Sequence, residues 1–357
     1  MTSLDLTSPL LRRPGAVAAE APDAQVAAHY GVPYREQTAL AAGTALVDLA
    51  HRPVLRIAGV DRLSWLHDLT SQSLRALPPG QWTEALILSP QGHVEHHLQL
   101  VDDGEQVLAH VEPGTADALL AYLTRMQFML RVQVSLVTDS HAVVFEGGAH
   151  RFVPRDALTG LGLAGPGSAE SGSAESGSAG SGSAGLGSVG LGSVEPGLAG
   201  LGLAGLWAYD ALRVAARRPR LGVDTDHRTI PNEVSWLVSA LHLDKGCYRG
   251  QETVARVYNL GRPPRRLVLL HLDGSDSTLP AAGSPVLLDD REVGVVGSAV
   301  RHHELGPIAL ALVKSKVPDD AVLLAGGVPA AIDPDDQPAP VSPARQAAAA
   351  RSGLLRF

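Results

Sequence analysis

The sequence contains one cysteine, Cys247, in 357 residues. A single thiol cannot form a disulfide within the chain, which excludes the disulfide-stabilised folds of small secreted proteins. It also falls short of the roughly four thiolate or imidazole ligands that common iron–sulfur clusters need. The adjacent histidine pairs His96-His97 and His302-His303 do not fill this gap, because strand neighbours point to opposite faces. The sequence therefore predicts no metal site and no permanently bound cluster.

Long apolar runs are also absent from the sequence. No uninterrupted apolar stretch reaches the roughly 18 residues that a membrane-spanning helix needs. The first 31 residues lack the basic start and apolar run of a secretory signal. The net charge of −8 opposes a general phosphate-binding surface, so direct nucleic-acid binding is not expected. These absences predict a cytoplasmic protein that does not enter the membrane.

Glycine, by contrast, is abundant and recurs at every fifth position from Gly162 to Gly202. This period fits neither the 3.6-residue repeat of a helix nor the two-residue repeat of a strand. Glycine loses much backbone entropy on folding, and the Ser and Ala between the glycines bury little surface. Residues 162–206 are therefore predicted to form a flexible insertion. The tails 1–27 and 334–357 are predicted to be disordered.

The remaining sequence predicts an α+β fold. Leucines at helical spacing predict helices over residues 61–69 and after Thr115, with strands between them. After Arg265 only strands are predicted, at 267–272, 285–288, 292–300 and 308–313. Short strands with turn signals between them are typical of a small barrel or sandwich. We expect one α+β region from residues 28–155 plus 207–262, and a β-barrel from residues 263–332.

The segment from residue 245 to 256 carries the clearest chemical signal. Two glycines flank the thiol, so Cys247 can lie on a tight, exposed turn. Lys245 and Arg249 lie two residues away on either side, and a nearby cation lowers the pKa of a thiol. The alternative is an inert, buried structural cysteine, which is the commoner state of a free cysteine. These residues alone leave both interpretations open.

This segment resembles the signature of the YgfZ family, K-G-C-Y-x-G-Q-E followed by V-A-R. The matching residues are Lys245, Gly246, Cys247, Tyr248, Gly250, Gln251, Glu252 and Arg256. The run D-L-A-H ending at His51 is similar to the D-L-S-H of the related glycine-cleavage T-proteins. The resemblance covers roughly residues 28–155 and 207–330 and skips the glycine repeat. The repeat is therefore expected to be an insertion inside one folded unit.

The resemblance implies a ring of two α+β modules and a C-terminal β-barrel around a channel that binds tetrahydrofolate or a derivative. It also implies Cys247 and Lys245 as candidate catalytic residues. Asp48, Glu233 and Trp236 are candidates for the channel wall, and Trp236 could stack on a pterin, although a core tryptophan is more common.

Four arginines form a basic cluster in this acidic chain: Arg256, Arg262, Arg265 and Arg266. The cluster is either a solvated strand end or a site for an anion, such as the glutamyl tail of folate. Arg262 and Arg266 are the candidates for that tail.

Two positions depart from the aminomethyltransferase pattern. T-proteins carry an acidic pair after the glycine turn, whereas this chain has His96-His97 after Gly92. T-proteins also carry a glutamate that holds the pterin, and Ala215 stands at its place. An unmet pterin donor costs about 1–3 kcal/mol when buried. Both departures count against aminomethyl transfer.

The resemblance therefore implies a folate-binding accessory protein that supports iron–sulfur cluster assembly or repair, and so supports iron–sulfur enzymes such as tRNA-modifying ones. Its partners would be folate and iron–sulfur assembly or client proteins. A tetrahydrofolate-dependent aminomethyltransferase or demethylase is the first alternative. A structural adaptor that has lost its ligand is the second.

Overall fold

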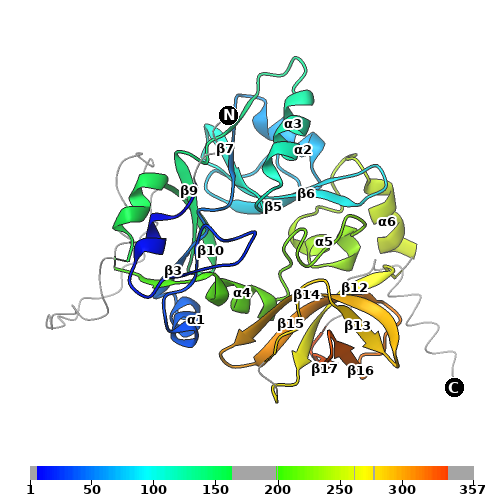
Figure 1. Cartoon of the computed structure of the whole chain (residues 1–357). Coiled ribbons are helices and arrows are strands. Elements are labelled where there is room, and N and C mark those ends of the chain that lie inside the picture. Colours follow the sequence, from blue (N-terminus) through cyan, green and yellow to red (C-terminus); the bar gives the residue numbers. More distant parts are fainter. Residues whose placement is uncertain (1–5, 163–197, 199, 261, 276–277, 337–357) are drawn as a thin grey trace, which may run out of the picture.

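A computed structural model of the chain describes residues 6–162, 198, 200–260, 262–275 and 278–336. Figure 1 shows two mixed helix-and-strand regions above a strand-built barrel, with α4 (Leu206–Ala215) and α5 (Trp236–Ser239) between them. The predicted α+β architecture of two modules and a C-terminal β-barrel is confirmed. Every helix of the described residues is too short or too polar to cross a lipid bilayer.

The first module is a five-stranded sheet with the strand order β5-β6-β7-β4-β8. Its strands are β4 (Val54–Ala58), β5 (Trp82–Leu88), β6 (Val94–Asp102), β7 (Gln106–His110) and β8 (Gln133–Leu136). Helices α2 (Arg62–Leu69) and α3 (Ala116–Arg125) pack on one face. There Leu55, Ile57 and Leu98 meet Leu66 and Leu119 in one apolar core. The period-two alternation of the strands leaves a second face for the other modules.

The second module is a four-stranded sheet with the order β10-β9-β3-β11. Its elements are β3 (Ala45–Asp48), β9 (His141–Glu146), β10 (Ala149–Pro154), β11 (Gly202–Ala204), α1 (Pro33–Ala41) and the 3₁₀ helix η2 (Arg155–Gly160). Strand β11 pairs in parallel with β3, so residues 202–204 belong to the sheet. The predicted range of the flexible insertion, 162–206, therefore ends too late, because it includes strand β11. The repeat at 163–197 and residue 199 lies outside the described residues.

The N-terminal segment is ordered from residue 6 onward, and the prediction of a disordered tail over 1–27 is wrong for this part. It contains η1 (Pro9–Arg12), β1 (Val17–Ala18) and β2 (Ala27–His29). Leu10 and Val26 are fully buried, and Arg13 donates to the carbonyl oxygens of Thr159 and Leu161. Several partners of this segment, such as Thr159, Leu161 and Arg220, lie more than 100 residues away in the sequence, so its mixed composition gave no local signal of order.

The C-terminal module is a closed barrel with the order β12-β15-β14-β13-β16-β17, as predicted. Its strands are β12 (Arg265–Leu272), β13 (Pro285–Leu288), β14 (Arg291–His302), β15 (Gly306–Lys314), β16 (Val322–Ala325) and β17 (Val328–Ile332). Its outer surface contacts α4, where Val214 packs against Leu269 and Leu310. Residues 334–336 continue the ordered chain, since Asp336 accepts a hydrogen bond from Arg217 at 2.7 Å. The rest of the predicted tail lies outside the described residues.

Charged side chains are buried where the modules meet. Arg220 donates to Asp23 at 2.8 and 2.9 Å and to Glu112 at 2.9 Å. Asp23 also lies 2.9 Å from Nε2 of His51, and Glu112 lies 3.1 Å from Arg52. The Arg220 and His51 contacts outweigh burial and hold the pKa of Asp23 well below its usual range. This group is called the buried charge network below.

The network continues into the barrel through a second arginine. Arg213 on α4 donates to Asp210 at 2.6 Å and to Asp224 at 2.8 Å. Asp224 in turn accepts from the backbone N–H of Arg220 at 2.8 Å and of Ser298 in β14 at 2.7 Å. A continuous set of ion pairs and hydrogen bonds therefore joins the N-terminal segment, both α+β modules and the barrel.

The Asp23→Ala variant is expected to lose about 3–5 kcal/mol of unfolding free energy, because it removes the carboxylate that the buried Arg220 and His51 share and leaves Arg220 with Glu112 alone. Denaturant unfolding measures this loss. The control is Asp68→Ala, which removes an ion pair to Arg75 whose two side chains are 61% and 62% exposed, and it should change stability little. Equal stability of the two variants would contradict a structural role for the network.

Candidate functional site

The signature segment forms a loop and the start of α6 (Gln251–Leu260), and it docks on the first module. Tyr248 is buried in a core that includes Leu86 of β5, Trp236 of α5 and Leu312 of β15. Gly250 has a φ of +80°, and a Cβ there would stand 2.6 Å from the carbonyl oxygen of Ser89. The glycine therefore allows the loop to lie against the turn between β5 and β6.

Lys245 holds the loop in place rather than standing free beside the thiol. Its ammonium donates to the carbonyl oxygens of His67, Thr70 and Gln72, the last at 3.3 Å. Burial lowers the pKa of Lys245 to about 8. These main-chain contacts give Lys245 a structural role at the C-terminal end of α2, and its predicted catalytic role stays a prediction.

Cys247 is exposed, so the interpretation of an inert, buried thiol is wrong. Nothing lies within 4 Å of the Cβ position of the neighbouring Gly246. Arg249 forms an ion pair with Glu95 at 3.1 Å, which directs its charge to β6. The thiol is thus presented to solvent on a loop that is anchored on both sides.

The remaining signature residues stabilise this segment. Gln251 donates to the carbonyl oxygen of Lys245 at 3.4 Å. Glu252 and Arg256 form an exposed ion pair with each other at 3.0 Å on α6. The signature therefore encodes a docked loop more than a set of side chains that point at a ligand.

The three candidates for the channel wall are all buried. Asp48 is buried and accepts from Ser8 and from the N–H of Ala50, and burial raises its pKa. Glu233 is buried in an ion pair with Arg265 at 2.9 Å. Trp236 is buried as well, and its ring lies 4.6 Å from the ring of His97.

The basic cluster expected at the barrel is mostly neutralised. Arg265 pairs with Asp226 as well as Glu233, Arg266 pairs with Asp319, and Arg256 is paired on α6. Arg262 is exposed and forms no ion pair with the described residues. Three of the four arginines are thus already paired with acids, and the glutamyl-tail role of Arg262 and Arg266 stays a prediction.

Polar and aromatic side chains gather instead on the second face of the first sheet. Glu84, Gln99 and His110 stand directly opposite one another on β5, β6 and β7. Trp82 lies two residues from Glu84 on β5 and therefore faces the same side of the sheet. His97 lies two residues from Gln99 on β6 and faces that side for the same reason. The register therefore places a carboxylate, an amide, two imidazoles and an indole on one side of the sheet.

The second module and α5 supply the facing side of this cluster. His150 and Phe152 of β10 lie 4.7 Å from His110 and 5.0 Å from Trp82, measured between ring centroids. The ring of Trp236 lies 4.6 Å from His97. We name Trp82, Glu84, His97, Gln99, His110, His150, Phe152 and Trp236 the central cluster.

The central cluster holds one carboxylate among aromatic and imidazole rings. Burial would raise the pKa of Glu84, but its contacts with His97 and Ser239 outweigh it and lower the pKa to about 2. Burial lowers the pKa of His150 to about 3 and that of His110 well below its usual range. Nε2 of His110 is buried without a hydrogen bond, whereas the Glu84 side chain is 26% exposed. This arrangement suits a flat heteroaromatic ligand whose N–H groups can donate to Glu84.

Sequence reasoning did not identify Glu84, Gln99, His110 or His150 as site residues. The sequence signal that could have indicated this cluster is the occurrence of polar residues at every second position of otherwise apolar strands. His96 and His97 do point to opposite faces as predicted, since His96 stacks near Tyr122 at 6.4 Å between ring centroids. The rings of His302 and His303 lie only 4.5 Å apart, because β14 ends at His302. No group of metal ligands is found among the described residues.

A separate cavity of about 1380 Å³ lies between the N-terminal segment, α4 and the barrel. Its lining includes Trp207, Arg213, Arg220 and Val295. Neither Cys247 nor the central cluster lines it. This cavity therefore lies apart from the loop that carries Cys247, which docks on the first module.

The Gly250→Ala variant is expected to destabilise the docked loop by at least about 1–2 kcal/mol, since its φ of +80° disfavours a Cβ and the space is filled. The matched control is Gly246→Ala, which has open space and should change stability little. Thermal unfolding compares the two variants. If Gly246→Ala were the more damaging, the described packing of the loop would be incorrect.

Comparison with known proteins supports this architecture. Residues 265–339 match the family described as CAF17, C-terminal beta-barrel domain. A chloroplastic protein of Arabidopsis thaliana named as a transferase is 24% identical over 275 residues, which span 72% of this chain and 62% of that protein. An aminomethyltransferase of Nostoc sp. (strain PCC 7120) is 28% identical over 307 residues, spanning 79% of this chain and 80% of the relative.

The fold has a solved counterpart. The crystal structure of the glycine cleavage system aminomethyltransferase T from Bartonella henselae superposes with a TM-score of 0.65 at 18% identity, covering 90% of this chain and 93% of that one. The chain therefore has a T-protein-like fold, and its C-terminal barrel is similar to that of the CAF17 family.

Proposed function

We propose that the chain binds a reduced folate at the central cluster and serves as an accessory protein for iron–sulfur enzymes. The observation that carries the first half is Glu84, a partly exposed carboxylate with a lowered pKa among aromatic and imidazole rings. The T-protein-like fold and the aminomethyltransferase relative support a folate as the ligand. The resemblance of residues 245–256 to the YgfZ family supports the second half.

The chemistry of a pterin fits this cluster. Its 2-amino group and ring N–H are adjacent donors, and a carboxylate can accept from both. Trp82 or Trp236 can contribute an aromatic surface to the ring. Ala215, at the end of helix α4, cannot accept a hydrogen bond through its side chain, and Glu84 on β5 would supply the acceptor instead. His110 and His150, whose pKa values burial lowers, can supply hydrogen bonds without adding positive charge to the site.

Two other functions remain distinguishable from this one. An aminomethyltransferase or demethylase would form methylene-tetrahydrofolate from an aminomethyl or methyl donor, and the proposal expects none. A ligand-free adaptor would bind no folate at all. The expectation of a cytoplasmic location stays a prediction.

Tetrahydrofolate is expected to bind the wild-type protein and quench its tryptophan fluorescence. The Glu84→Gln variant should bind about tenfold more weakly or worse, because one pterin donor then loses its charged acceptor. Calorimetric titration measures the change. Glu105→Gln, in the exposed turn between β6 and β7, is the control. Equal affinity in both variants would place the pterin elsewhere, and absent binding in wild type would favour the adaptor.

The Cys247→Ala variant separates the two halves of the proposal. Its folate affinity should match wild type, because the thiol is exposed and outside the central cluster. In cells that lack the protein, it should restore less iron–sulfur enzyme activity than wild type does, if the thiol takes part in exchange with a partner. Full restoration by Cys247→Ala would make the thiol dispensable.

A further inference from the structure

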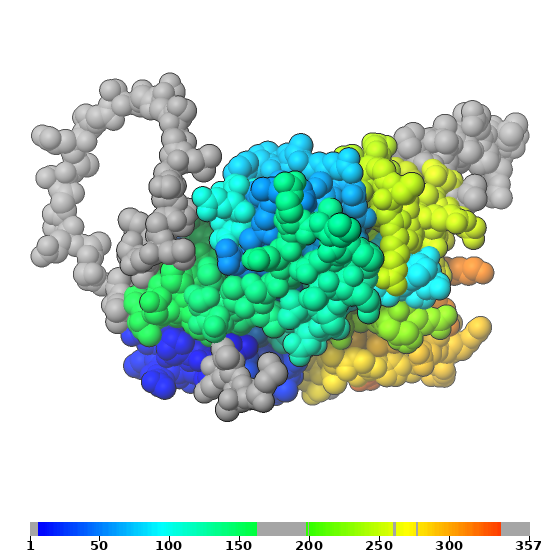
Figure 2. Space-filling view, turned by 90° about the horizontal axis from the view of Figure 1, so that it is seen from above, coloured from blue at the N-terminus to red at the C-terminus, as the bar shows by residue number. Residues whose placement is uncertain are grey.

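The first module ends in a strand edge that no described strand covers. β8 is the last strand in the order β5-β6-β7-β4-β8, and it pairs only with β4 within the described chain. Gln133, Ser135 and Leu136 are exposed. Figure 2 shows the region around α3 and the following segment, coloured teal, at the upper surface of the molecule.

The register identifies the free backbone groups of this edge. The N–H of Val137 donates to the carbonyl oxygen of Val54 at 2.9 Å, so Val137 directs its backbone groups to β4. Residues two apart in a strand share this direction, which assigns Ser135 to the same side. Val134 and Leu136 therefore direct their N–H and C=O groups to the free edge.

An apolar loop stands next to this edge. Phe128, Met129 and Leu130 are 82%, 98% and 46% exposed. Both ends of the loop are fixed, since Trp65 donates to the carbonyl oxygen of Met126 at 2.9 Å and Arg131 pairs with Asp61 at 2.8 Å. Exposed apolar groups on a fixed loop mark an interaction surface.

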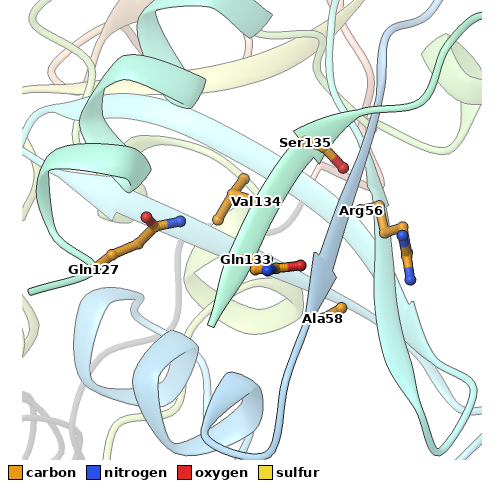
Figure 3. A pocket seen from close by; sticks show the side chains of 6 residues that line it. All are labelled: Arg56, Ala58, Gln127, Gln133, Val134 and Ser135. Carbon is orange, nitrogen blue, oxygen red and sulfur yellow. The ribbon is translucent and has the colours of Figure 1, made fainter. Parts of the chain in front are cut away.

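The strand lacks the features that normally prevent edge pairing. It contains no charged residue and no proline, which are the usual protections of an exposed edge. A hollow of about 270 Å³ lies beside it, and Figure 3 shows that Arg56, Ser135 and Gln127 line this space. Arg56 is exposed and forms no ion pair with the described residues. The surroundings of the free edge therefore attract negative charge.

We propose that β8 docks an extended segment of a partner protein in which apolar and acidic side chains alternate. The added strand would exchange backbone hydrogen bonds with Val134 and Leu136. Because Val134 lies on the α3 side of the sheet and Ser135 on the side of Arg56, an alternating strand presents its apolar groups to the exposed loop and its carboxylates to Arg56. This site is distant from Glu84 in the strand order and does not rest on the folate proposal.

A displayed library of random linear peptides, selected on the full chain, tests this inference, and the enriched peptides are then titrated by calorimetry. We expect them to alternate apolar and acidic residues. Val134→Pro removes the outward N–H without touching the bonds to β4, and it should weaken binding about tenfold or more. Val134→Thr keeps the N–H and should bind like wild type. Arg56→Glu should weaken acidic peptides selectively.

Thermal unfolding first confirms that each variant is folded. A selection without binders, or binders indifferent to Val134→Pro, would overturn the proposal. So would binding to phosphatidylglycerol vesicles that is lost in Phe128→Ser, because the loop would then serve a membrane. Dimerisation in sedimentation that Val134→Pro abolishes would assign the edge to a second copy instead.

Discussion

The buried charge network is the constraint on which the arrangement of the three modules depends. Asp23 from the N-terminal segment, Glu112 after β7 and Asp224 after α4 are brought together by Arg213 and Arg220. A buried charge without a partner costs several kcal/mol, so each module must be in place for the others to be stable. The network thus favours one relative placement of the modules. Apolar contacts alone would specify that placement less strictly.

This placement determines what the centre of the molecule can bind. Arg213 and Arg220 are paired with acids, whereas Nε of Arg52 is buried without a hydrogen bond among the described residues. Burial keeps His110 and His150 neutral in the same region. Glu84 is the one carboxylate of the cluster, which favours a ligand that donates hydrogen bonds over an anion. A pterin edge satisfies this condition, whereas the anionic glutamyl tail would have to lie elsewhere, such as near the exposed Arg262.

Local sequence patterns predicted the elements whose stability is local. The barrel strands followed from alternating apolar residues and turn signals, and the glycine-flanked turn at Cys247 followed from glycine's backbone freedom. The order of residues 6–27 could not be predicted this way, because it comes from contacts such as Asp23 with Arg220, which are 197 residues apart. The central cluster was missed for the same reason. Glu84, Gln99 and His110 come together only through strand register, and single polar residues in strands do not reveal which face they share.

The motif residues of the signature segment are explained by the packing of the loop. Lys245, Tyr248 and Gly250 all serve to fix the loop against α2 and the β5–β6 turn. The same turn precedes β6, which carries His97 and Gln99 of the central cluster. A ligand that moved β6 would therefore move the platform on which the loop rests, and the exposure of Cys247 would change with it. If the central cluster binds a folate as proposed, ligand binding and thiol presentation act on one packed unit, even though Cys247 does not line the central cluster.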